Sequence, residues 1–329
     1  MTALHKIVVI GGGTGSFTLL SSLKKHTPFI TALVNMADDG GSTGVLRDEL
    51  GVLPPGDVRQ CLVALSDSAE LRDLFTYRFE EGRFKGHAFG NLFLTALEKM
   101  TGDFARAVEV ASEVLAITGS VEPITLTNVR LAMRENGGSE VHGEFNIGNR
   151  KFKGKDRPEF WLEPKARANP KALRAIAQAD LVIIAPGNLY GSLAPALIVP
   201  SVGEALAKSN AKKLYVCNLV TKPGQTGSFT VADFADEIER LAGQPFLDMV
   251  LYNTEMPDAT LLEKYSAEGE LAVTFDLEVL GQKHYQAVGT NLLSSTLWQN
   301  TSKADPIAAA RTLIRHDGDA VARAIMELL

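Results

Sequence analysis

The stretch Lys6-Ile7-Val8-Val9-Ile10-Gly11-Gly12-Gly13-Thr14-Gly15 decides the fold. Its short run of β-branched residues is typical of a parallel strand that is buried on both faces. Glycines end this strand, and apolar residues at near-helical spacing predict a helix over 16–25. A second apolar run over 29–35 predicts another strand. The N-terminal sequence therefore indicates a βαβ unit with a glycine-rich loop after its first strand.

The same alternation of strands and helices returns in the second half of the chain. Apolar runs at 181–184, 213–219 and 246–252 predict strands, and helical stripes separate them. Such alternation predicts a mostly parallel sheet that is covered by helices on both faces. We therefore expect an α/β protein with a Rossmann-like three-layer α/β/α fold.

The region between these halves has a different character. Residues 124–127 and 141–147 alternate in polarity, and Asn136-Gly137-Gly138 between them is a hairpin signal. This pattern predicts an antiparallel β insertion at about 120–165. The chain shows no internal repeat and no low-complexity linker, so we expect residues 1–329 to form a single nucleotide-binding domain. Residues 37–57, rich in Gly, Pro and Asp, are expected to form a long irregular loop.

Composition excludes several classes of protein. Hydrophobic residues make up 45% of the 329 residues and the formal net charge is −6, so neither disorder nor attraction to nucleic acid is expected. No apolar run approaches the roughly 18 residues of a membrane span. Cys61 and Cys217 lie in apolar runs outside any CxxC pattern, which indicates buried thiols, no zinc site and a reducing cytoplasmic environment.

The glycine loop is the first candidate binding site. Glycines let backbone N–H groups approach an anion at a helix N-terminus, and the Thr14 hydroxyl can donate to a phosphate oxygen. No lysine follows in the position of a P-loop, and Ser16 stands where a dinucleotide fingerprint has its third glycine. We expect Gly12, Gly13, Thr14 and Gly15 to bind phosphate, with a tight turn as the purely structural alternative.

Acidic residues follow in two further loops. Asp38 and Asp39 suit ribose hydroxyls or a Mg²⁺ ion beside a phosphate, although a turn or a helix cap would also use them. In Pro54-Pro55-Gly56-Asp57-Val58-Arg59, Asp57 suits either a helix cap or a metal, and Arg59 suits a phosphate. Both alternatives stay open on the sequence.

Three more polar stretches complete the set. In open parallel sheets, ligands bind beyond the carboxyl ends of the strands. Gly187, Asn188 and Tyr190 follow one predicted strand, and the next ends in Cys217-Asn218-Leu219-Val220-Thr221-Lys222, in which we select Asn218. His87 and Asn91 begin a helix, where His87 is either a general base or a structural, capping histidine.

These loops, taken in order, resemble one family. The stretches 11–15, 37–42, 54–59, 86–91, 186–190 and 216–218 resemble the gluconeogenesis-factor type of bacterial protein, whose broader relatives include the 2-phospho-lactate transferase of deazaflavin cofactor synthesis. The resemblance implies a Rossmann-like fold, binding of UDP-sugars such as UDP-N-acetylglucosamine, and a regulatory role in cell shape during growth on gluconeogenic carbon sources. It also implies nucleotide-sugar contacts by Tyr265 and Arg315, and cell-wall synthesis regulators as partners.

The transferase branch gives the alternative function. There the resemblance implies a metal-associated catalytic aspartate, and Asp57 looks like that position. Gly40-Gly41 stands where the transferases carry bulky apolar residues, and the second aspartate near Asp57 is missing. We therefore favour a nucleotide-sugar-binding regulator over a metal-dependent transferase and leave catalytic activity open. A nicotinamide-dependent oxidoreductase is disfavoured by the broken glycine pattern, and the apolar helices permit a homodimer.

Overall fold

The fold is built on a seven-stranded parallel sheet. The computed structural model describes residues 5–135, 137–152, 157–295 and 313–329. In spatial order the strands are β10 (Gln286–Thr290), β9 (Met249–Asn253), β8 (Lys212–Val216), β7 (Leu181–Ile184), β1 (Ile7–Gly11), β2 (Ile30–Val34) and β3 (Ser120–Pro123). Each neighbouring pair is parallel. The predicted α/β class is confirmed.

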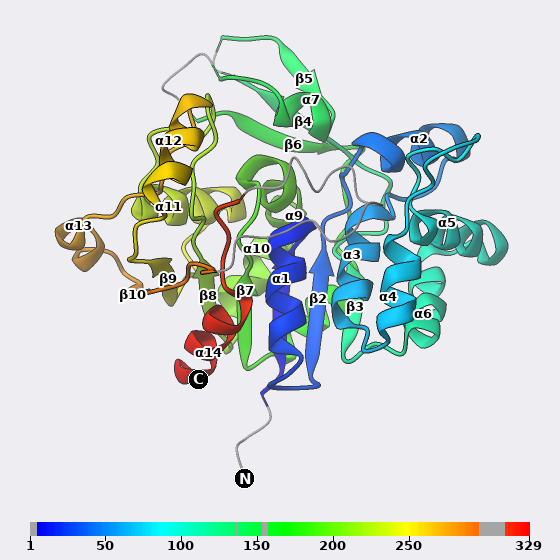
Figure 1. The fold of residues 1–329 in the computed structure, drawn as a ribbon, viewed down its shortest axis with the longest axis horizontal. Coiled ribbons are helices and arrows are strands. Elements are labelled where there is room, and N and C mark those ends of the chain that lie inside the picture. Colours follow the sequence, from blue (N-terminus) through cyan, green and yellow to red (C-terminus); the bar gives the residue numbers. More distant parts are fainter. Residues whose placement is uncertain (1–4, 136, 153–156, 296–312) are drawn as a thin grey trace.

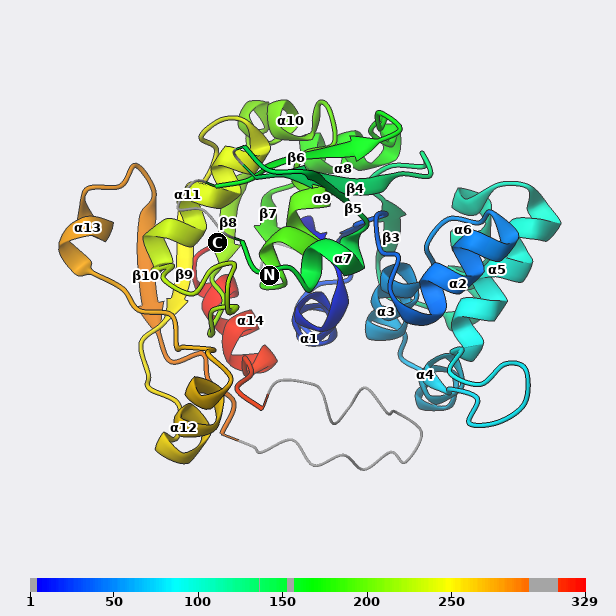
Figure 2. The ribbon, with the colours of Figure 1, turned by 90° about the horizontal axis from the view of Figure 1, so that it is seen from above.

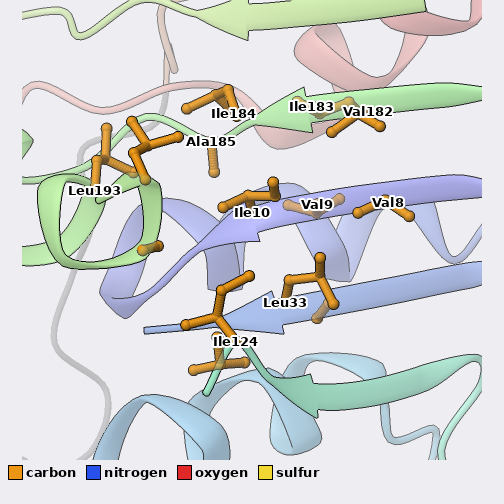
Figure 3. Close-up of a cluster of buried hydrophobic side chains, with 14 of the residues drawn as sticks. Val8, Val9, Ile10, Leu33, Ile124, Val182, Ile183, Ile184, Ala185 and Leu193 are labelled. Carbon is orange, nitrogen blue, oxygen red and sulfur yellow. The ribbon is translucent and has the colours of Figure 1, made fainter. Parts of the chain in front are cut away.

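The centre of the sheet is apolar on both faces, as its β-branched sequences predict. Figure 3 shows Val9 and Ile10 of β1 between Leu33 of β2 and Ile183 of β7, all of which are buried. Continuous apolar strands of this kind need helices on both sides, because neither face of the sheet tolerates water. Burial of these side chains contributes about 1.5–3 kcal/mol each.

Helices cover the two faces of this sheet (Figures 1 and 2). One face carries α1 (Gly13–Leu23), α3 (Gly56–Leu65) and the C-terminal α14 (Gly318–Glu327). The other carries α8 (Pro170–Gln178), α10 (Val202–Lys208) and α11 (Val231–Ala242). The order of the strands reverses at β1 and β7, which are adjacent, and this reversal forms a crevice beyond their carboxyl ends.

Residues 37–57 are not the irregular loop that we predicted. They contain α2 (Gly41–Leu50), which ends at Gly51 in the left-handed conformation (φ 67°). Glycine is required inside this helix, because a Cβ at Gly44 would lie 2.2 Å from the Asp39 carbonyl oxygen. The high glycine content suggested a loop, but Gly44 instead allows the helix to pack closely against the preceding backbone. Three further helices extend this side of the molecule: α4 (Ala69–Thr76), α5 (Phe89–Thr101) and α6 (Phe104–Leu115).

The antiparallel insertion exists as a three-stranded sheet in the order β5 (Glu140–His142), β4 (Arg130–Arg134) and β6 (Glu159–Glu163). Figure 1 shows it beyond the carboxyl ends of the main strands. Residues 120–123 belong to the main sheet as β3, and 124–127 make only an isolated bridge at Thr125. The hairpin residue Asn136 lies outside the described residues.

One element of the insertion differs from the prediction. The alternating stretch 141–147 was expected to be a strand, but after β5 it forms the short helix α7 (Glu144–Gly148). The reason is tertiary: Asp39 Oδ1 accepts a hydrogen bond from the Phe145 backbone N–H at 2.8 Å, which satisfies an N–H of the helix start. This helix directs Glu144 toward the main sheet.

The remaining described elements are short. They are the π-helical turn η1 (Leu189–Leu193), α9 (Ala194–Leu197), α12 (Ala259–Ala267) and α13 (Leu277–Gly281). No single helix among the described residues is long and apolar enough to cross a membrane; only the pair 189–197 and 202–208 reaches that length, across a 74° bend.

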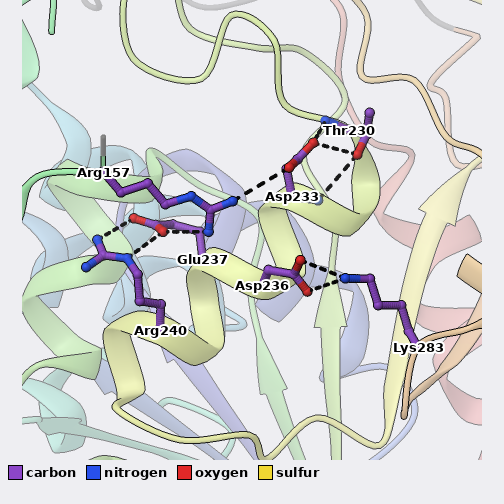
Figure 4. Close-up of polar contacts among 7 residues, drawn as sticks. All are labelled: Arg157, Thr230, Asp233, Asp236, Glu237, Arg240 and Lys283. Carbon is purple, nitrogen blue, oxygen red and sulfur yellow. Dashed lines mark hydrogen bonds and ion pairs between the residues drawn. The ribbon is translucent and has the colours of Figure 1, made fainter. Parts of the chain in front are cut away.

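A buried ionic network joins the insertion to α11 (Figure 4). Glu237, whose side chain is fully buried, accepts hydrogen bonds from Arg157 at 2.9 Å and from Arg240 Nε at 2.7 Å. Arg240 also donates to the Pro158 carbonyl oxygen at 3.0 Å. The same carboxylate is hydrogen-bonded to the Tyr190 side chain. This carboxylate therefore fixes the base of β6 on α11.

We predict that Glu237→Ala lowers the free energy of unfolding by about 2–3 kcal/mol. Removing this buried carboxylate takes away the carboxylate that both arginines share, and the remaining Arg157–Asp233 pair and the partial exposure of both arginines reduce the cost. Urea unfolding followed by circular dichroism measures the change. Glu204→Ala is the matched control, because Glu204 forms an exposed pair with Lys208 and its loss should leave the midpoint unchanged. Equal midpoints for both variants would contradict the prediction.

Candidate functional site

A cavity of about 410 Å³ lies at the crevice beyond β1 and β7. Four segments line it: the glycine loop after β1, the turn after β7, the segment after β8, and the chain just before α14. Their lining residues include Gly12–Gly15, Pro186–Asn188, Asn218–Lys222 and Ile314–His316. The predicted convergence of separate loops on one edge of the sheet is therefore seen for these segments.

The glycine loop is shaped by two close contacts. A Cβ at Gly15 would lie 1.9 Å from the Pro186 carbonyl oxygen, and one at Gly12 would lie 2.1 Å from Asp57 Oδ2. Gly13 has a φ of 67°, which glycine adopts without strain. Helix α1 starts here with Gly12 as its N-cap and without a side-chain cap. The positive end of the helix dipole therefore faces the cavity, which favours an anion.

Two asparagines hold the loops that line the cavity. Asn218 Nδ2 donates to the Gly187 carbonyl oxygen at 2.7 Å, and Asn218 Oδ1 accepts from the Tyr215 hydroxyl at 3.1 Å. Asn188 Oδ1 accepts from the Gly191 N–H at 3.2 Å. Both residues line the cavity, and both also fix the backbone of the neighbouring turns.

Hydrogen bonds to Tyr265 hold the segment that carries Arg315 in position. The Tyr265 hydroxyl accepts hydrogen bonds from the backbone N–H groups of Leu313 and, at 3.1 Å, of Ile314. Tyr265 is buried and lies outside the cavity lining, whereas Arg315 lines it. His316 bonds the Cys217 carbonyl oxygen through Nε2 at 3.1 Å, and burial lowers its pKa to about 4, so it is neutral.

Four carboxylates form an acidic cluster beside the glycine loop. Asp57 Oδ1 accepts a hydrogen bond from the Gly13 N–H at 3.0 Å, and Asp38 Oδ1 accepts one from Gly40 N–H, also at 3.0 Å. Asp39 caps α7, as described above. Glu144 reaches the cluster from the insertion and feels the charges of Asp38 and Asp39. None of the four carboxylates lines the cavity itself.

Burial and mutual repulsion keep protons on this cluster. Burial first, and then the charges of Asp38 and Glu144, raise the pKa of Asp57 to about 8. Burial also raises the pKa of Asp38, and burial with the neighbouring aspartates raises that of Glu144 to about 7. Asp57 and Glu144 therefore carry less negative charge at neutral pH than two free carboxylates would.

A metal site is not formed by these side chains. Among the residues that the structure describes, no group of three or more His, Cys, Asp or Glu side chains is arranged to hold a metal ion. Asp57 Oδ1 and Asp38 Oδ1 each already accept a hydrogen bond from a backbone N–H. We therefore derive no chemical step through Mg²⁺.

The other predicted residues lie in polar contacts away from the cavity lining. Arg59 Nε donates to Asn91 Oδ1 at 2.9 Å, which ties α3 to α5. His87 Nδ1 lies 2.8 Å from the Ser42 hydroxyl, at the N-terminal turn of α2. Tyr190 is buried and stacks on Phe160 with ring centroids 4.9 Å apart.

Three charged residues near the site were given no role by the sequence analysis. Lys222 and Glu270 line the cavity, and Glu144 approaches Lys222 from the insertion. Lys222 follows a strand by only a few residues, and this position was the available signal. Glu144 gave no such signal, because it lies in a stretch that alternates like a strand.

The chain is similar to known proteins over most of its length. Residues 7–293 match the family model described as 2-phospho-L-lactate transferase CofD. A gluconeogenesis factor of Bacillus subtilis is 39% identical over 326 residues, which cover 98% of each chain. A relative of the same description in a Nostoc species is 46% identical over 291 residues, which are 88% of this chain and 63% of that protein.

A solved structure agrees over almost the full length. A crystal structure of a UPF0052 family member from Bacillus halodurans superposes with a TM-score of 0.88 at 35% identity, covering 99% of this chain and 100% of that one. The resemblance read from the six loop stretches is therefore confirmed at the level of the family and the fold.

We predict that titration of Asp57 makes the protein less stable as the pH rises. The folded pKa of about 8 lies above the unfolded value of about 4. Stability from the neutral form is thus complete below pH 4 and is lost as the pH rises toward 8, with a slope of up to about 1.4 kcal/mol per pH unit.

Urea unfolding of wild type and Asp57→Asn between pH 4.5 and 8.5 measures this effect. The amide still accepts the Gly13 hydrogen bond but does not titrate in this range. The stability of the wild type relative to the variant should fall steadily with pH. Parallel pH profiles would show that Asp57 has an ordinary pKa.

Proposed function

The chain belongs to the family described as 2-phospho-L-lactate transferase CofD, and we propose that it is a gluconeogenesis factor that binds a nucleotide-linked sugar. The ligand class that we favour is a UDP-sugar such as UDP-N-acetylglucosamine. The observation that carries this proposal is the cavity itself. Its volume of about 410 Å³ lies in the range of small-ligand sites, and it joins a helix N-terminus to an arginine.

The chemistry of the lining suits a diphosphate with polar groups at both ends. The glycine loop offers the positive end of α1 to the phosphates, and Arg315 offers a guanidinium to the uridine-sugar end. Tyr265 then contributes to binding indirectly, because its hydroxyl holds the backbone that precedes Arg315. Glu270 is the carboxylate within the described lining, so it accepts sugar hydroxyls in this proposal. Asp38 and Asp39 lie outside the lining, which weakens their proposed ribose contact.

A regulatory role in cell shape on gluconeogenic carbon sources is part of the same proposal. The description of the relatives as gluconeogenesis factors supports the link to gluconeogenesis, and the role in cell shape rests on the family resemblance. We further propose a cytoplasmic location, which suits the two free buried cysteines. Cell-wall synthesis regulators and a second copy of the chain are the partners that this role would involve.

A transferase activity is the second candidate, and Asp57 is the observation that favours it. This carboxyl contacts the glycine loop and has a pKa near neutrality, as a general acid or base requires. In that case the ionised Asp57 would take the proton of an acceptor hydroxyl as its oxygen bonds to phosphorus of a nucleotide-linked phosphoester, while the P–O bond to the nucleotide breaks and the nucleoside monophosphate leaves. The family match is consistent with such chemistry.

Isothermal calorimetry tests the ligand directly. We expect UDP-N-acetylglucosamine to bind more tightly than NAD or GDP, each titrated with and without Mg²⁺. The uridine and the sugar supply contacts that the other two ligands lack. If no UDP-sugar produced heat under any condition, the leading function would be wrong.

We predict that Arg315→Ala weakens UDP-N-acetylglucosamine binding by about 10- to 100-fold, the effect of losing one hydrogen bond to a charged group. The circular dichroism spectrum should stay unchanged. Arg323→Ala is the matched control, since Arg323 lies exposed on α14 outside the cavity. Unchanged affinity in the Arg315 variant would refute its assigned role.

The transferase candidate has its own test. Incubation with a guanosine-linked phosphoester and an alcohol acceptor, followed by chromatography, measures turnover. If the protein is a transferase, we expect turnover in the wild type and its loss by at least about 100-fold in Asp57→Asn, because the proton-transfer group is removed. Turnover that survives in Asp57→Asn would exclude this mechanism.

A further inference from the structure

Lys222 stands at the wall of the cavity without a fixed ionic partner. Its side chain lines the cavity, and among the described residues it takes part in no ion pair within 4 Å. The carboxylates of Glu144 and Glu270 interact electrostatically with this ammonium. A buried ammonium is costly unless it meets an anion, and burial lowers the pKa of this lysine.

The backbone of Lys222 is fixed although its ammonium is not paired. Its N–H donates to Thr226 Oγ1 at 2.8 Å, and its carbonyl oxygen accepts from the N–H groups of Thr226 and Gln225 at 2.9 and 3.1 Å. A turn closed by three hydrogen bonds holds the Cα in place. The side chain is therefore presented to the cavity from a rigid base.

The antiparallel insertion holds this turn from the other side. Gln225 Nε2 donates to three carbonyl oxygens of the insertion, those of Ile147, Gly148 and Arg150, at 2.8, 3.2 and 3.0 Å. Phe152 N–H donates to the Gly224 carbonyl oxygen at 2.7 Å. Lys222 Nζ itself lies near the end of α7, 3.9 Å from where a Cβ on Gly148 would stand.

We propose that Lys222 is a specificity-determining residue that binds the phosphate groups of the ligand, with Gln225 as its positioning residue. The ammonium and the N-terminus of α1 belong to the same cavity, so a phosphate group between them meets positive charge from both walls. The inference rests on the proposed nucleotide-sugar function but adds its charge selectivity. In this proposal the antiparallel insertion has the function of fixing the turn that carries Lys222.

Selectivity follows from the charge of Lys222. A ligand with two phosphates gains the contact, whereas the bare nucleoside does not, because it has no anionic group to meet the ammonium. The site therefore discriminates between phosphorylated and unphosphorylated forms of one ligand.

Calorimetry on the full chain with UDP-N-acetylglucosamine, uridine and inorganic pyrophosphate tests the proposal. We expect Lys222→Met to weaken UDP-N-acetylglucosamine and pyrophosphate by about 10- to 100-fold and to leave uridine unchanged. Lys222→Arg should retain most of the affinity. Gln225→Ala should weaken both phosphate ligands by a smaller factor, and raising the salt concentration should weaken them less in Lys222→Met than in wild type.

Lys208→Met is the matched control, because it removes one exposed lysine on α10. Thermal melting confirms that each variant is folded, and Lys222→Arg provides the readout if Lys222→Met is not. Equal losses for uridine and pyrophosphate, or no loss for either, would overturn the role of Lys222. The pyrophosphate arm separates the two proposals: if wild type binds pyrophosphate through Lys222 but no UDP-sugar, only the proposed function fails.

Discussion

The contact on which the site depends is the one between Asp57 and the glycine loop. The end of β1 has no room for a side chain at Gly12, because the Asp57 carboxylate fills that space and accepts the Gly13 N–H. This contact links the start of α3 to the turn between β1 and α1. It also seats the helix N-terminus at the crevice where the order of strands reverses. Any larger residue at Gly12 would displace the carboxylate and the loop together.

Much of the fold was readable from the sequence because its central strands are continuous apolar runs. The apolar residues of strands β1 and β7 themselves predict that these strands are buried, so no contact with distant residues had to be known. Helices α2 and α7 were missed for the opposite reason. Helix α7 is capped by Asp39, more than 100 residues away, and no local pattern encodes such a contact. Glycine inside α2 resembles a loop signal, but it allows a backbone to approach closely.

The candidate site was likewise predictable where the signal was local and not where it depended on tertiary contacts. The glycine loop, Gly187, Asn188 and Asn218 were found because they follow strands, and parallel strands end at one edge. Tyr190 and Arg59 were polar residues in the right stretches, yet their side chains point into packing contacts instead. Lys222 and Glu144 were missed because their meeting depends on the insertion folding back over the main sheet. Position along one strand does not reveal a contact between two layers.

The arrangement of charge around Asp57 reconciles an acidic cluster with a neighbouring anion site. Lys222 and Arg315 line the cavity, whereas the aspartates and Glu144 lie outside its lining. An ionised carboxylate at roughly 8 Å from a phosphate would repel it by about 2 kcal/mol at an effective dielectric constant of 20. Burial raises the pKa of Asp57 and Glu144 toward neutrality, which removes much of that repulsion. A transferase would instead need the ionised Asp57 carboxylate to take the proton of the attacking hydroxyl, so the protonated form suits anion binding and the ionised form suits catalysis. The transferase candidate also requires an acceptor hydroxyl to reach Asp57, whose Oδ1 accepts the Gly13 N–H and whose Oδ2 lies against Gly12.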